Sequence, residues 1–495
     1  MTDPAVARPH EPGDATLAGL DAAFAPWRGV NFTAQMLLRS FGGLHPSGRT
    51  WFCISGGQMY TGSAATCSKG FGGSTCGICA SYKLRKDAIH HMVLQYLARM
   101  PQPDMEMCVP FNCGDAPKAF TDSMISKSAS RRSASRPLLT LSYTTAPSIT
   151  HDIAFPDYRD WQVWPNALAE ADRAPTLPWA LKKARAVIPF GNYSFLCGDD
   201  RSPQNSKERC WWYAGSSRGG GVQTCDGAAA GQIAGRRRDD LAGGLASLNR
   251  TYRTCSPIAA AGPLNMALRH ALVHGDCERH GELEVVNGGI FSPRGLAWLP
   301  KEHMCGYKYL VLSTGTSNWL SHFKESLLCG SVVIFVADTA GRDSVYPSTQ
   351  ALAAAVSPLT RLLVPDEHFV LLEANSTQAD RRGGTRRALC DRLAATVASL
   401  VRDDKRARRI ATKGLRLVRQ HYNLDSIYRY MDAVFHRLAA KQSADEVQRF
   451  IAKMKGVPVD ESNYSSVVVG PRKDPYAGTP RSMSTPGRNG IFHIQ

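Results

Sequence analysis

The alternation of apolar and polar residues along the chain predicts strands and helices in succession. Strands are expected at residues 51–60 (two strands joined by a Gly turn), 105–111, 137–143, 307–313, 331–336 and 368–372. Apolar residues at helical spacing predict helices at residues 81–100, 318–328, 386–401, 405–421 and 424–440. Because strand and helix alternate, the pattern predicts an α/β fold with a parallel sheet. Residues 1–29 and 461–495 are rich in Pro and small or polar residues and are expected to be disordered.

The composition is that of a globular protein, with 43% hydrophobic, 20% charged and 8% aromatic residues. No apolar run reaches the ~18 residues of a membrane helix, so no transmembrane span is expected. The net charge of +17 attracts phosphate groups, whether of a nucleic acid, a membrane face or a nucleotide diphosphate. The alternative is an ordinary basic surface. Because no nucleic-acid-binding motif accompanies the charge, no nucleic-acid partner is expected.

The chain has 14 Cys residues, an even number that suits disulfides. Glycosylation sequons lie at Asn31, Asn192, Asn249, Asn375 and Asn463. Both features favour the secretory pathway, although the first residues lack the pattern of a signal peptide. We therefore expect a lumenal protein whose leader is not in this chain, and free thiols are the alternative. Cys76-x-x-Cys79 has no second pair at zinc-finger spacing, so no metal site is predicted.

A candidate catalytic residue follows the strand expected at residues 105–111. The sequence there continues into Gly114-Asp115-Ala116-Pro117. A carboxylate just beyond the carboxyl end of a strand lies where open α/β sheets bind ligands, so Asp115 is a candidate general base. The alternative is an Asp that closes a turn before Pro117.

Two further segments are candidates for binding an anion. Residues 212–221 combine small residues with Arg218, which suits a phosphate, but they match neither a Walker A loop nor a dinucleotide fingerprint. In residues 312–331 a strand runs through a Gly/Ser/Thr turn into a helix with His322 and Lys324. A helix N-terminus after a strand is a common anion site. The alternatives are a surface loop for the first segment and a packed or surface histidine for His322.

Several short stretches are informative through their shared order. They are Pro103-Asp104-Met105-Glu106-Met107, Asn112-Cys113-Gly114-Asp115-Ala116-Pro117, His151-Asp152-Ile153, Trp164-Pro165, Cys305-Gly306-Tyr307-Lys308-Tyr309-Leu310, His322-Phe323-Lys324, Tyr346-Pro347 and the run from Asp403 to Tyr428. Together, over residues 51–440, they resemble the Rumi-type protein O-glucosyltransferases and the related fungal capsule-associated glycosyltransferases.

The resemblance implies a GT-B fold, in which two Rossmann-like domains face a cleft. On this basis we expect an N-terminal acceptor domain at 30–180, a C-terminal donor domain at 181–424 with an irregular insertion at 187–262, and closing helices at 425–460 that pack on the N-terminal domain. The implied reaction is inverting transfer of a sugar, glucose first and xylose second, from a UDP-sugar to a hydroxyl of a protein or glycan acceptor. Asp115 would be the base. No cofactor or essential metal is expected.

The resemblance also assigns a donor site and a disulfide. The implied donor-binding residues are Gly215, Ser216, Arg218, Gly315, His322, Lys324, Ser331 and Asp343. Ala214 and His322 stand where the family carries Arg, so a sugar- or protein-binding module without catalysis is the alternative function. Cys305 is expected to pair with Cys329, and a second pair is expected among Cys67, Cys76 and Cys79. Both pairs imply the lumen of the endoplasmic reticulum or Golgi.

Overall fold

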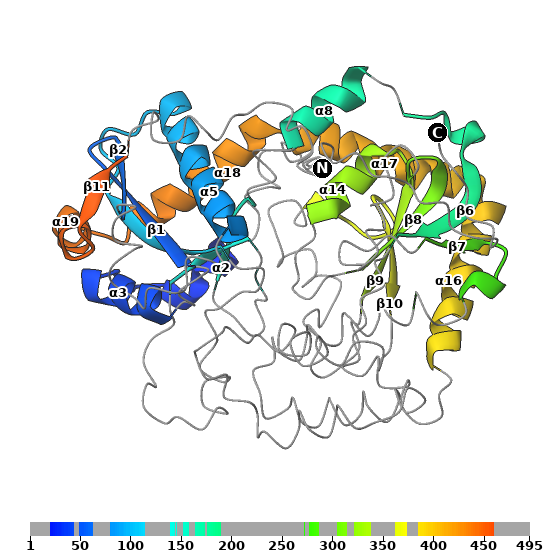
Figure 1. Ribbon diagram of the computed structural model, residues 1–495, viewed down its shortest axis with the longest axis horizontal. Helices are drawn as coiled ribbons and strands as arrows, with labels where there is room; N and C mark the ends of the chain where they lie inside the picture. Colours follow the sequence, from blue (N-terminus) through cyan, green and yellow to red (C-terminus); the bar gives the residue numbers. More distant parts are fainter. Residues whose placement is uncertain are drawn as a thin grey trace, which may run out of the picture.

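The computed structural model describes residues 20–43, 49–62, 80–113, 139–143, 145, 152–157, 164–173, 176–189, 272, 277–286, 304–313, 321–337, 362–373 and 385–459. Within these ranges the chain forms two sheets with helices around each, which confirms the predicted α/β fold (Figure 1). The expectations for residues 1–19, for the insertion beyond residue 189 and for residues 460–495 lie outside the described residues.

The first sheet is mixed and has six strands in the order β11-β2-β1-β3-β4-β5. They are β1 (Arg49–Ser55), β2 (Gln58–Gly62), β3 (Met107–Asn112), β4 (Leu141–Ser142), β5 (Ile153–Ala154) and β11 (Gly456–Pro458). β1 is antiparallel to β2 and β3, and β11 is antiparallel to β2, whereas β3, β4 and β5 are parallel. Of the strands in this sheet, β3, β4 and β5 have the parallel order that a Rossmann-like domain requires, and β1, β2 and β11 do not.

The predicted hairpin at residues 51–60 is present as β1 and β2. Its turn consists of Gly56 and Gly57, with φ angles of 56° and 76°. Both values lie in the left-handed region, which a tight two-residue hairpin turn demands and which Gly adopts without steric cost. The Gly-Gly pair therefore fixes the register of the two strands.

The second sheet consists of five parallel strands in the order β10-β9-β8-β6-β7. They are β6 (Lys183–Ile188), β7 (Leu283–Val285), β8 (Tyr307–Ser313), β9 (Val332–Ala337) and β10 (Val370–Glu373). Counted along the chain, this is the order 5-4-3-1-2, one of the two common orders of doubly wound α/β folds. In such folds ligands bind beyond the carboxyl ends of the strands where the order reverses, which here is between β6 and β8.

The helices predicted from apolar spacing are present with small shifts at their ends. They are α5 (Ala80–Arg99), α14 (Ser321–Leu328), α16 (Thr385–Arg402), α17 (Asp404–His421) and α18 (Leu424–Ala439). Three more helices within the described ranges were not predicted: α2 (Leu20–Phe24), α3 (Ala34–Gly43) and α8 (Trp164–Arg173). α19 (Ala444–Lys453) lies in the region 425–460, where closing helices were expected. No helix in the described ranges is long and apolar enough to cross a membrane.

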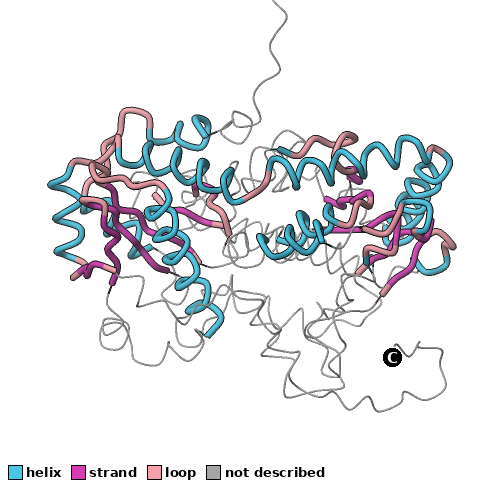
Figure 2. Tube along the Cα trace, turned by 90° about the horizontal axis from the view of Figure 1, so that it is seen from above, coloured by secondary structure: helices cyan, strands magenta, loops and turns pink. Residues whose placement is uncertain are grey.

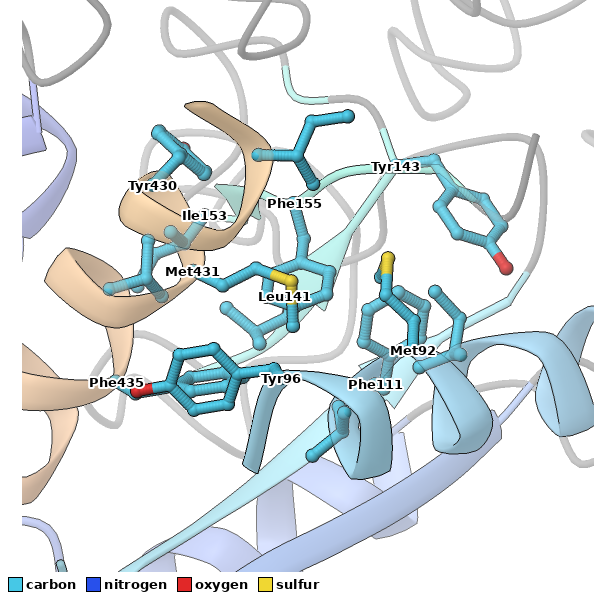
Figure 3. Packing of buried hydrophobic residues seen from close by; sticks show 14 of the residues in the cluster. Met92, Tyr96, Phe111, Leu141, Tyr143, Ile153, Phe155, Tyr430, Met431 and Phe435 are labelled. Atoms are coloured by element: carbon cyan, nitrogen blue, oxygen red, sulfur yellow. The ribbon is translucent and has the colours of Figure 1, made fainter. Parts of the chain in front are cut away.

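α18 covers one face of the first sheet together with α5. The ring of Phe435 on α18 lies 5.7 Å from Phe52, 5.1 Å from Tyr96 and 5.7 Å from Phe155, measured between centroids (Figure 3). The Tyr430 hydroxyl donates a hydrogen bond to the backbone oxygen of Ala154 in β5, at 2.7 Å. An aromatic core therefore joins the C-terminal part of the chain to the N-terminal strands.

α19 covers the opposite face of the same sheet. Neighbouring strand residues point to opposite faces, so Trp51 points away from the α18 side. Its ring meets that of Phe450 on α19 edge to face, 5.4 Å between centroids. Gln442, just before α19, accepts from Cys108 N at 2.8 Å and donates to Cys108 O at 3.1 Å. Both faces of the first sheet thus depend on C-terminal helices.

α17 packs against the second sheet through a small residue in its apolar stripe. A Cβ at Gly414 would lie 2.6 Å from the His368 carbonyl oxygen and 2.8 Å from Leu327 Cδ2. Only glycine therefore permits the observed approach of α17 to α14 and to the turn before β10. From α17 the chain turns at Tyr422 and Asn423 into α18 and so passes from the second sheet to the first (Figures 1 and 2).

Candidate functional site

The carboxyl edge of the second sheet leads into the segments that carry the predicted donor residues. β6 is followed by the segment with Gly215, Ser216 and Arg218, and β9 by the segment with Asp343. β8 continues through Gly315 to α14, whose second residue is His322. The first turn of a helix offers unpaired N–H groups and a positive dipole end to an anion. Gly215, Ser216, Arg218, Gly315 and Asp343 themselves lie outside the described residues.

Lys324, two residues after His322, is held inside the protein. Its side chain is 3% exposed, and its Nζ lies 3.7 Å from Asp157 Oδ2, which is also buried. The rings of Trp164 and Tyr422 each lie 5.9 Å from the same ammonium group. Because Asp157 follows β5, this pair connects α14 to the first sheet. Lys324 thus positions α14, and its contact with the donor stays a prediction.

Ser331 lies at the amino edge of the second sheet, opposite the edge where a donor is expected. Its hydroxyl donates to Tyr307 O at 2.7 Å and accepts from Lys182 Nζ at 2.9 Å. Lys182 also donates to Cys305 O at 2.9 Å and to Cys329 O at 2.5 Å. The buried ammonium ties together the starts of β6, β8 and β9. Ser331 therefore has a structural role at this edge, and its binding of the donor stays a prediction.

Burial lowers the pKa of Lys182 from its usual 10.5 to about 8. Above pH 8 the folded protein releases this proton while the unfolded chain still holds it, so the free energy of unfolding rises with pH up to about 10.5. We expect Lys182→Met to remove this rise and to lower the unfolding free energy by about 2 kcal/mol at pH 7, because three acceptors lose their donor. Urea denaturation of both proteins from pH 7 to pH 10 measures this. Parallel pH dependence in the two proteins would contradict it.

Three disulfides lie within the described residues. Cys305 is bonded to Cys329, the pairing that the resemblance implies. Cys53–Cys108 joins β1 to β3, and Cys277–Cys390 joins the short helix η5 (Cys277–Arg279) to α16. Neither of these pairs was predicted. The expected pair among Cys67, Cys76 and Cys79 lies outside the described residues.

We expect alkylation without reductant to leave six cysteines unmodified: Cys53, Cys108, Cys277, Cys305, Cys329 and Cys390. Peptide mass mapping should then recover the three linked pairs. Reduction should lower the midpoint of thermal unfolding, chiefly through Cys277–Cys390, which closes a span of 113 residues. Alkylation of all six under non-reducing conditions would contradict both the pairs and a lumenal location.

The carboxyl ends of β3 and β4 in the first sheet carry a buried polar network. Asn112 Nδ2 donates to Ser142 Oγ at 3.3 Å, and Ser142 Oγ donates to Asp152 Oδ1 at 2.5 Å. Asn112, Ser142 and Asp152 are 2%, 1% and 4% exposed. Asp115 is itself outside the described residues. In the sequence it follows Asn112 by three residues.

No role was predicted for Asp152, although its stretch carries part of the resemblance. β4 and β5 have two residues each, too few for an alternation of apolar and polar positions to mark the strand ends. The described residues contain no group of three His, Cys, Asp or Glu side chains that could hold a metal ion.

No protein-family model matches the chain, and no curated protein is significantly similar to it. Function is therefore inferred from the strand topology and from the residues that follow the strands.

Proposed function

We propose that the protein is an inverting glycosyltransferase that moves a sugar from a UDP-sugar to a hydroxyl of a protein or glycan acceptor. The observation that carries this proposal is the strand order of the second sheet. It reverses between β6 and β8, the strands followed by the segments with Arg218 and His322. In the GT-B arrangement that we propose, the second sheet binds UDP and the first supplies the base, Asp115.

On the donor side, the proposed ligands match the chemistry of a nucleotide diphosphate. Arg218 offers a guanidinium that can hold two phosphate oxygens, and the first turn of α14 offers N–H groups and a protonated His322. Gly215, Ser216 and Gly315 let the backbone approach the phosphates closely. The buried Lys324–Asp157 pair supports this role indirectly, because it fixes the helix that carries His322.

In the transfer step, the Asp115 carboxylate takes the proton of the acceptor hydroxyl as its oxygen attacks the anomeric carbon. The new C–O bond forms on the face opposite UDP. The bond from the anomeric carbon to the β-phosphate oxygen breaks, its electron pair leaves with UDP, and the configuration inverts. Cations beside the leaving diphosphate stabilise the charge that develops there. Glucose is the first expected sugar and xylose the second.

The disulfides support placing this reaction in an oxidising compartment of the secretory pathway. We propose the lumen of the endoplasmic reticulum or Golgi. The acceptor is then a Ser or Thr of a folded protein module, or a glycan.

UDP release from a panel of UDP-sugars, together with UDP affinity at pH 6 and pH 7.5, tests the proposal. We expect turnover of one sugar and tighter UDP binding at pH 6, because imidazole has a reference pKa of ~6.5 and is largely protonated there. In His322→Arg the gain in UDP affinity at pH 6 relative to pH 7.5 should be smaller than in the wild type, since the charge of Arg is permanent and only the terminal phosphate of UDP still titrates. No turnover, together with no UDP binding at either pH, would favour the binding module. Binding of UDP without turnover of any sugar would mean that the acceptor is missing from the assay.

A further inference from the structure

Residues 164–173 and 176–181 run antiparallel to α17 and form an exposed edge beside it (Figure 1). At one end, Trp164 Nε1 donates to Tyr422 O at 2.7 Å, next to the C-terminus of α17. Arg419, in the last turn of α17, donates to the α8 carbonyl of Ala171 at 2.7 Å. At the other end, Trp179 Nε1 donates to Asp404 Oδ1 at 3.0 Å, in the first turn of α17.

This edge exposes aliphatic side chains where the chain forms the short helix η3 (Trp179–Leu181). Leu181 is 68% exposed and Leu177 is 40% exposed. Val401, three residues before Asp404, is also 40% exposed. These are three of the five large hydrophobic residues that are exposed within the described ranges, and all three flank the Trp179–Asp404 contact. Single exposed aliphatics are common, but their gathering at one place marks an interaction surface.

The outer face of α17 beside these aliphatics is basic. Lys405, Arg408, Arg409 and Arg416 are exposed and form no salt bridge within the described ranges, whereas Arg406 and Lys413 pair with Asp366 and Glu367. The nearby acidic residues are already engaged: Asp404 pairs with Lys308 at 2.8 Å, and Asp403 caps α17 by accepting from Arg406 N. The free charge along this face is therefore positive.

We propose that this amphiphilic ridge, made of Leu177, Leu181, Val401, Lys405 and Arg408, docks the protein on an anionic phospholipid bilayer. The aliphatic side chains enter the boundary between headgroups and acyl chains, and the basic side chains meet the headgroup phosphates. The protein lies on the bilayer and does not cross it.

The combination of groups favours a bilayer over other anionic partners. A nucleic acid or an anionic glycan uses the basic side chains but gains nothing from Leu177 and Leu181. A folded protein needs a pocket that matches a protruding Leu181, whereas a bilayer deforms around it. The proposal is independent of sugar transfer, because none of these residues belongs to the proposed donor or acceptor site.

Co-sedimentation of the full chain with phosphatidylcholine vesicles, with and without 30% phosphatidylserine, tests the proposal. We expect binding to the anionic vesicles only, weakened at 0.5 M salt. Leu177→Ser/Leu181→Ser should weaken binding at least tenfold. Lys405→Ser/Arg408→Ser should weaken it by a further factor of about five for each lost charge. The matched controls are Val457→Ser, an aliphatic residue of similar exposure on β11, and Arg429→Ser/Lys453→Ser on α18 and α19, which should bind as the wild type does.

Unchanged thermal unfolding of each variant shows that lost binding is not lost folding. Absence of binding to anionic vesicles would overturn the proposal. So would tight binding to heparin or single-stranded DNA that Leu177→Ser/Leu181→Ser leaves unchanged, because that result would assign the face to a polyanion. Equal loss in the ridge variants and in the controls would overturn it as well, since binding would then follow net charge alone.

Discussion

Replacing Asp115 by Asn is expected to lower kcat for sugar transfer by about 10²–10⁴-fold and to leave the affinity for UDP unchanged. The amide keeps the size and hydrogen-bonding shape of the carboxylate but cannot accept the proton of the acceptor hydroxyl. UDP binds at the second sheet in the proposed arrangement, whereas Asp115 follows β3 of the first, so the two measurements separate catalysis from donor binding.

Asp104→Asn is the matched control for this variant. Asp104 is exposed and lies shortly before β3, so the control removes a carboxylate from the other end of the same strand. Its kcat should equal that of the wild type. If Asp115→Asn transferred sugar at the wild-type rate, the base would have to be another carboxylate, and the buried Asp152 beside Ser142 would be the next to test.

Gly414→Ala is expected to destabilise the protein by about 2–3 kcal/mol, a change opposite in sign to the usual effect in a helix. In a helix interior, Ala is favoured over Gly by about 1 kcal/mol. Here the added Cβ would lie 2.6 Å from a backbone oxygen, that of His368, which cannot rotate away as a side chain can. α17 would have to move off α14 and the turn before β10, and the packing lost there outweighs the gain in propensity.

Urea denaturation of wild type, Gly414→Ala and Gly42→Ala measures this reversal. Gly42 is exposed on α3, and a Cβ there would meet nothing within 4 Å. Gly42→Ala should therefore show the ordinary helix effect and stabilise the protein by about 0.5–1 kcal/mol. A Gly414→Ala protein as stable as the Gly42→Ala protein would contradict the close approach of α17.

The elements that could be predicted from sequence are those with one clear burial pattern. In α17, buried Ala407, Ile410 and Ala411 alternate with exposed basic residues, and β9 is buried throughout. The predicted ends of both elements therefore lie within one residue of the observed ends. β6 was missed because its first residues, Lys183, Ala184 and Arg185, are not buried and only its end is apolar. β4 lies within the strand predicted at residues 137–143, whereas β5, which pairs with β4, was not predicted because it has only two residues.

The candidate site divides in the same way. The position of Asp115 after a strand could be predicted, because it depends on one element and its end. The resemblance placed His322 at the start of a helix, and α14 begins at Ser321. The burial of Lys324 could not, since it depends on Asp157, Trp164 and Tyr422, which lie far from it in the sequence. Likewise, the sequence shows only that Ser331 comes after a helix and before a strand. That it lies at the amino edge of the sheet, away from the edge where the donor is expected, becomes clear only from the arrangement of the strands.

The return of α18 and α19 to the first sheet determines when that sheet can form during synthesis. Tyr430 is 276 residues away from the β5 residue to which it donates a hydrogen bond. A ribosome adds about 5–20 residues per second, so the N-terminal strands wait tens of seconds for the helices that cover their faces. During that interval Phe52, Tyr96 and Phe155 lack Phe435, the ring that each of them contacts in the folded protein. The nascent chain is therefore expected to depend on chaperones until residue 459 has emerged, and fragments that end before α18 should aggregate.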